Sequence, residues 1–286
     1  MLPWTLEDID LTAVPVANGE AEETLALIIA AASLVESASH LYTSNLTQYF
    51  ATDLEVSRWL IEHWEPEELQ HGRALRAWTE RAWPDFDWEA TFKDFFTEYS
   101  MLCRLDSLEA TPALEMVARC VVETGTAALY RSLSTLAHEP VLRQLTSLIH
   151  ADEVRHYKYF YRFFRRYQGL EHLSRWRISR VLFERSREIR RDDSGCAIRH
   201  IVRARGTGKS STSSQVNNWT QAIHRQVRQG CPYDMAARMF LAPLDLPPGV
   251  RLWVSGGLAI GARVAMQGLP WRSHRAWADE RPQPLG

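Results

Sequence analysis

Two short segments constrain this chain most, because each holds a glutamate three residues before a histidine. They are Glu68-Leu69-Gln70-His71 and Glu153-Val154-Arg155-His156. On an α-helix, side chains three residues apart leave the same face one turn apart. A further glutamate precedes each pair: Glu36 ends an apolar run, and Glu123 lies in a second helical segment. The order Glu, Glu-x-x-His, Glu, Glu-x-x-His predicts four helices that turn these side chains toward one interior.

The side-chain chemistry of this set is that of a site for two metal ions. Successive glutamates of the pattern are 32, 55 and 30 residues apart. Carboxylate oxygens can bridge two cations, and a neutral imidazole on each cation leaves coordination positions open for dioxygen. The mixture favours iron or manganese, whereas structural zinc prefers closed sites rich in cysteine. The predicted metal ligands are Glu36, Glu68, His71, Glu123, Glu153 and His156.

Periodicity and capping residues predict an all-α fold. An irregular arm is expected over 1–19. Core helices are expected at about 20–45, 53–83, 111–137 and 139–169, with an extra helix at 88–105 between the two halves. Pro66 predicts a kink in the second of these. Residues 170–286 are expected to form an Arg-rich helical extension. Its predicted parts are helices at about 170–191, 214–229, 233–240 and 250–266, a flexible stretch at 205–214 and a disordered tail at 282–286.

The residues around the two pairs resemble motifs of a known family, the soluble acyl-carrier-protein desaturases of the ferritin-like superfamily. Trp64-Glu65-Pro66-Glu67-Glu68-Leu69-Gln70-His71-Gly72 is similar to that family's tryptophan, two residues and Glu-Glu-x-x-His-Gly. Asp152-Glu153-Val154-Arg155-His156 matches its Asp-Glu-x-Arg-His. Glu123 with Thr126 resembles a glutamate followed, three residues later, by a threonine near the oxygen-binding side of the metals. The resemblance covers about residues 20–170.

This resemblance implies a ferritin-like four-helix bundle (20–169) and a non-haem di-iron oxidoreductase. Two iron ions, or an iron–manganese pair, would use O2 as co-substrate and electrons from an external reductase or ferredoxin. The expected reaction removes hydrogen from an unactivated C–H bond of a lipophilic or acyl substrate, as in a fatty-acyl desaturase. Thr126 would gate or protonate the oxygen species. Asp152 would orient a ligand histidine, since metal-bound imidazoles need an acceptor for their other N–H.

Two alternatives stay open at this point. A hydroxylase or N-oxygenase of a small metabolite, or of a nucleotide in tRNA, would keep the same ligands. A non-enzymatic, ferritin-like iron-binding protein would also keep them, although an iron cage needs neither the extra helix nor the long extension.

Charge and composition suggest partners and compartment. Residues 162–209 contain fourteen Lys or Arg against five Asp or Glu, so this segment is a candidate docking surface for an acidic carrier protein or, less favoured, tRNA. Four cysteines without a CxxC pair, and an N-terminus without a basic segment, favour a cytoplasmic protein with reduced thiols. The apolar run Leu25–Val35 is too short to span a bilayer, so no membrane span is expected. A homodimer is left open.

Overall fold

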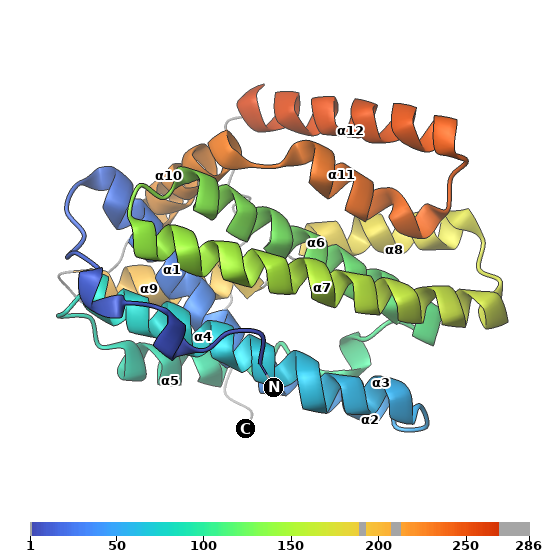
Figure 1. Cartoon of the computed structure of the whole chain (residues 1–286), viewed down its shortest axis with the longest axis horizontal. Coiled ribbons are helices and arrows are strands. Elements are labelled where there is room, and N and C mark those ends of the chain that lie inside the picture. The colour runs from blue at the N-terminus through green and yellow to red at the C-terminus, as the bar shows by residue number, and fades with distance from the viewer. Residues whose placement is uncertain (1, 189–192, 207–212, 269–286) are drawn as a thin grey trace, which may run out of the picture.

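The computed structural model describes residues 2–188, 193–206 and 213–268, and within these ranges it contains helices and no β-strand (Figure 1). The prediction of an all-α protein is confirmed. The predicted tail (282–286) and most of the predicted flexible stretch (205–214) lie outside the described residues. The α-helices are α1 (Glu20–Ser37), α2 (Ser39–Tyr49), α3 (Leu54–Trp59), α4 (Glu65–Ala82), α5 (Trp88–Tyr99), α6 (Pro112–Leu136), α7 (Pro140–Glu171), α8 (Arg175–Glu188), α9 (Asp193–Arg205), α10 (Ser213–Gly230), α11 (Tyr233–Leu241) and α12 (Pro248–Gly268).

Two pairs of helices form the centre of the molecule: α6 packs along α7, and α1 packs along α4. The long helices α6 and α7 begin where their sequences predict. Thr111 caps α6 by accepting the N–H of Leu114, and Pro112 follows in the first turn. The Glu139 carboxylate caps α7 by accepting the N–H groups of Val141 and Leu142. These caps set the start of both helices, and thereby the height of Glu123 and Glu153 along them.

The first core helix is not continuous, contrary to the expectation of one helix over 20–45. α1 ends at Ser37 and α2 begins at Ser39, with Ala38 between them at φ −97° and ψ 6°. The break coincides with a close approach of α4. A Cβ atom added to Gly72 would lie 2.7 Å from the backbone nitrogen of Ser37, so only glycine fits there.

The second core helix contains the irregularity that Pro66 predicts, but in the form of a wider turn. Residues Leu60–Trp64 form a π-helical turn between α3 and α4, in which the N–H of Glu65 donates to the carbonyl of Leu60. Proline has no N–H, and its ring would clash with the carbonyl four residues earlier in a regular helix. The wider turn relieves that clash without ending the helix.

The N-terminal arm and the helix α9 of the extension both contribute to the core. Trp4, Ile9 and Val14 of the arm are buried, and so are four residues of α9: Cys196, Ala197, Ile201 and Val202. The sequence did not predict α9. It also placed the end of α7 at Gly169 and the end of α5 near residue 105. α7 instead continues to Glu171, where His172 adopts a left-handed conformation, and α5 ends at Tyr99.

One stretch among the described residues, Glu20–Tyr49, is long and apolar enough to cross a membrane by length and composition alone. It corresponds to α1 and α2. Most of it is buried inside the molecule, and it contains the break at Ala38 and the carboxylate of Glu36.

Candidate metal centre

The four central helices bring all six predicted ligand residues together. Glu36 lies in the last turn of α1, Glu68 and His71 near the start of α4, Glu123 in the middle of α6, and Glu153 and His156 in the middle of α7. Each of the six is 8% exposed or less. They form two overlapping groups in which the ligand atoms lie within 4.8 Å of one another: Glu36, Glu68, His71 and Glu153, and Glu68, Glu123, Glu153 and His156. Glu68 and Glu153 belong to both groups.

Each imidazole turns its Nδ1 atom toward the middle of the cluster. The Nδ1 of His71 lies 3.4 Å from Oε1 of Glu153 and 3.8 Å from Oε2 of Glu36. The Nδ1 of His156 lies 3.0 Å from Oε1 of Glu68 and 3.6 Å from Oε2 of Glu123. One histidine and one further glutamate thus complete each group around the two shared glutamates.

The inward-facing atoms of this cluster have no hydrogen-bond partner. These buried atoms are Oε1 of Glu68, Nδ1 of His71, Oε2 of Glu123, Oε1 of Glu153 and Nδ1 of His156. Leaving a buried polar atom unsatisfied costs about 1–3 kcal/mol, so five at one point need an explanation. Carboxylate oxygens and imidazole nitrogens are donors that iron and manganese accept. The residues present therefore fit a pair of divalent cations.

The outer nitrogen of each histidine is held by a carboxylate from the opposite helix. Nε2 of His71 lies 3.1 Å from Oδ2 of Asp152, and Nε2 of His156 lies 2.8 Å from Oε2 of Glu67. A carboxylate only accepts, so in a neutral imidazole the proton sits on Nε2 and the lone pair of Nδ1 faces the cluster. Asp152, which was expected to orient a ligand histidine, contacts His71.

Three further residues support this outer layer, and the sequence analysis assigned none of them. Arg155 joins the two carboxylates, because its Nη2 lies 2.6 Å from Oε2 of Glu67 and 2.7 Å from Oδ1 of Asp152. The indole of Trp4 donates to Oδ2 of Asp152 at 2.8 Å. Glu67 had a signal in the sequence, since it precedes Glu68 as Asp152 precedes Glu153. Trp4 had none, because it is 148 residues from its partner.

Three of the glutamates also have one oxygen fixed from outside. The hydroxyl of Tyr130 donates to Oε1 of Glu36. The indole of Trp64 donates to Oε1 of Glu123 at 3.2 Å. The hydroxyl of Thr126 donates to Oε2 of Glu153 at 2.5 Å. The other oxygens of these three glutamates stay directed at the cluster, and the hydrogen bond to Glu153 places Thr126 beside it.

Electrostatics at the cluster favour extra positive charge. Burial and the charges of Glu36 and Glu153 raise the pKa of Glu68 well above its usual value. Burial likewise raises the pKa of Glu123 to about 8, with a contribution from Glu153. Burial lowers the pKa of His71, but the hydrogen bond to Asp152 and the nearby carboxylates of Glu153 and Glu36 outweigh it and raise that pKa well above the usual value. Without a cation these groups retain protons, and a divalent cation can replace that charge.

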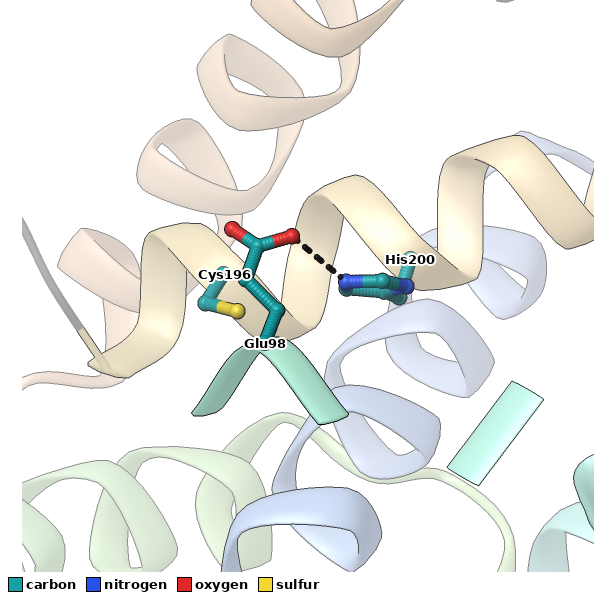
Figure 2. A group of neighbouring side chains, drawn as sticks. All are labelled: Glu98, Cys196 and His200. Atoms are coloured by element: carbon teal, nitrogen blue, oxygen red, sulfur yellow. Dashed lines mark hydrogen bonds and ion pairs between the residues drawn. The ribbon is translucent and has the colours of Figure 1, made fainter. Parts of the chain in front are cut away.

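A third group of metal-ligating residue types lies elsewhere, between α5 and α9 (Figure 2). It consists of Glu98, Cys196 and His200. The Nε2 of His200 lies 3.0 Å from Oε2 of Glu98, and the guanidinium of Arg199 donates to Oε1 of Glu98 at 2.5 Å. Both oxygens of this carboxylate already have protein donors. The group joins α5 to α9 without presenting a carboxylate to a cation.

Comparison with protein-family models, with curated proteins and with solved structures gave no match to this chain. Any assignment of function therefore rests on the residues of the central cluster and their geometry.

Proposed function

We propose that the central cluster binds two iron ions and that the protein is an O2-dependent di-iron oxidoreductase with a ferritin-like bundle. The observation that supports this most is the convergence of five unpartnered, buried donor atoms on one point. Glu68 and Glu153 would be shared by both metals. Glu36 with His71, and Glu123 with His156, would complete the two sites. The ligand helices α1, α4, α6 and α7 come in the order expected of such a bundle, with α5 between the halves.

When bound, the metals would supply the activation of dioxygen needed to remove hydrogen from an unactivated C–H bond, with electrons from an external reductase or ferredoxin. The protein's own residues would do the rest. Asp152 and Glu67 hold the imidazoles in one tautomer, and the low exposure of the ligands keeps water out. The hydroxyl of Thr126 holds a proton at Oε2 of Glu153, where it is available beside the reacting centre.

The substrate we propose is an acyl or other lipophilic chain, carried by an acidic protein. Much of the basic segment is already occupied within the chain: Arg162 and Arg166 pair with Glu55, and Arg199 pairs with Glu98. Among the exposed arginines of this segment, Arg177, Arg187 and Arg203 form no ion pair with a described residue. An acidic carrier would meet these. Hydroxylation or N-oxygenation of a metabolite or tRNA would use the same metals, but it would insert an oxygen atom into a different substrate.

The test is anaerobic titration with ferrous iron, followed by metal counting and optical spectra on adding oxygen. We expect two irons per chain in the wild type and a spectral change that Glu123→Ala abolishes. Glu98→Ala is the matched control, because it removes a carboxylate from the other cluster and should leave binding unchanged. Less than one iron per chain, or binding indifferent to Glu123, would contradict the proposal.

Activity screening then follows. Turnover of acyl carrier substrates would support the desaturase-like function, and turnover of amines or tRNA alone would replace it. A cage-sized assembly that stores iron without turnover would favour the iron-binding alternative.

A further inference from the structure

The helix α12 presents its apolar side chains outward. It packs on α11, with a few contacts to α10, and forms the outermost layer of the described chain at the top of Figure 1. Trp253 is 84% exposed, Leu252 73%, Ile260 67% and Val264 61%. A surface helix normally buries its apolar stripe and exposes its polar face. In α12 this order is reversed.

The helical positions of these residues define two faces. The face packed against the rest of the molecule consists of small residues, of which Ser255 is 6% exposed and Ala259 is 3% exposed. With 3.6 residues per turn, Trp253, Ile260 and Val264 lie on the opposite side. We call this side the outer face of α12; Val250 and Val254 extend it toward the start of the helix, and both are exposed.

The charges on α12 are of one sign. Residues 246–268 contain Arg251 and Arg263 and no lysine, aspartate or glutamate. Both arginines are exposed, and by helical position they lie on the two borders of the outer face. The guanidinium of Arg263 also lies 5.6 Å from the ring of Tyr233 on α11. The outer face is therefore an apolar strip bordered by positive charge.

We propose that the outer face of α12 binds the surface of a bilayer that contains anionic lipids. Trp253, Ile260 and Val264 would enter the boundary between headgroups and acyl chains, the position that such amphipathic helices adopt. The long side chains of Arg251 and Arg263 would reach the lipid phosphates. A second copy of α12 fits less well, because it would bring four arginines together without an acid to pair with them. The proposal needs no metal and is independent of the proposed reaction.

The experiment is co-sedimentation of the full chain with phosphatidylcholine vesicles, with and without phosphatidylglycerol. We expect binding to the anionic vesicles that weakens with salt. Trp253→Ser combined with Ile260→Ser should weaken it by about tenfold or more, since the apolar contact supplies much of the affinity. Arg251→Gln and Arg263→Gln should each weaken it by about fivefold on anionic vesicles only. Leu170→Ser is the matched control, because Leu170 is 75% exposed on α7, and it should change nothing.

Other outcomes would overturn the proposal. The first is no binding to either vesicle, and the second is binding unchanged by the Trp253 and Ile260 substitutions. A dimer in sedimentation that the same substitutions dissociate would assign the face to a second copy. Binding that appears only when the chain is shortened to end at Gly268 would assign it to the chain's own C-terminal segment. Because the substituted side chains are exposed, unchanged circular dichroism should confirm that the variants fold.

Discussion

Two clusters in this molecule contain the same kinds of side chain, and they differ in what their polar atoms contact. In the central cluster the outer nitrogens of both imidazoles and one oxygen each of Glu36, Glu123 and Glu153 have protein partners, and five inward atoms have none. In the cluster of Glu98, Cys196 and His200, both carboxylate oxygens already accept hydrogen bonds. Proximity of metal-ligating residues is therefore a weak criterion. A stronger one is a set of buried donor atoms that the protein orients but leaves unsatisfied.

The sharpest test of this difference is Glu153→Gln, compared with Glu98→Gln. Glu153 belongs to both groups of the central cluster, so its loss should abolish binding of both irons. Glu36→Gln should mainly weaken one site. Glu98→Gln should leave two irons bound, because neither of its oxygens faces a vacant position. Metal counting after ferrous titration measures all three. Equal losses in Glu153→Gln and Glu98→Gln would show that the comparison is wrong.

The next largest effect on metal binding should come from the carboxylates that hold the outer nitrogens of the two histidines. Asp152→Asn and Glu67→Gln each remove a carboxylate that holds Nε2 of a histidine. Changes of this type usually lower metal affinity by about 10–100-fold. Competition with a chelator measures the affinity. Since each carboxylate holds a different histidine, the two substitutions should affect different metal sites; identical effects on both sites would contradict that assignment.

The close packing that brings α1 to α4 should be sensitive to one methyl group. Gly72→Ala places a Cβ atom 2.5 Å from Oγ of Ser37. We expect a loss of about 1–3 kcal/mol in the free energy of unfolding, as for other overpacked positions, together with weaker iron binding. Gly125→Ala is the control, because a Cβ there meets nothing within 4 Å. Because alanine is a better helix former than glycine, Gly125→Ala in the interior of α6 should stabilise the fold by about 0.5–1 kcal/mol. Urea unfolding distinguishes the two.

The contributions of the two clusters to the stability of the fold should change with pH in opposite directions. In the metal-free protein, the raised pKa of Glu123 contributes stability that is present at low pH and is lost between its ordinary value of 4.5 and about 8. The raised pKa values of Glu68, His71 and His156 act in the same direction. The metal-free melting temperature should therefore fall as the pH rises from about 5 to 8.

Added ferrous or manganous ion should reduce this fall, because the cation replaces the protons. Burial instead lowers the pKa of His200, so this group's contribution to stability is lost as the pH falls. Melting curves with and without metal, in the wild type and in His200→Asn, measure both effects. A metal-free melting temperature that rises between pH 5 and 8 would contradict the assignment at the central cluster.

The smallest expected effect is on stability at the second cluster. Glu98→Gln weakens the link between α5 and α9 made by Arg199 and His200. Because Glu98 is partly exposed, we expect a loss of about 1 kcal/mol or less. Urea unfolding checks this value. A much larger loss would indicate that Glu98 has a role beyond joining the two helices.

Much of the helical pattern and the identity of the six clustered residues could be predicted from the sequence. Thr111-Pro112 and Glu139-Pro140 marked the starts of α6 and α7, and the spacing of Glu68 to His71 and of Glu153 to His156 placed each pair on one face. The break at Ala38 and the whole of α9 could not be predicted, because they depend on contacts with other helices, which leave no local pattern in the chain. Pro66 indicated that the second helix would be irregular, but not that the irregularity would be a π-helical turn.

Local spacing in the chain sets which side chains share a helix face, because an α-helix repeats every 3.6 residues regardless of its surroundings. Which faces meet depends on how the helices pack. Glu67 holds His156 and Asp152 holds His71 across two packed helices, and Trp4 completes the network from the far end of the chain. These partners depend on the rotation and offset of α4 against α1 and α7. Close contacts such as that of Gly72 with Ser37 set that arrangement, and it exists only when the helices are packed.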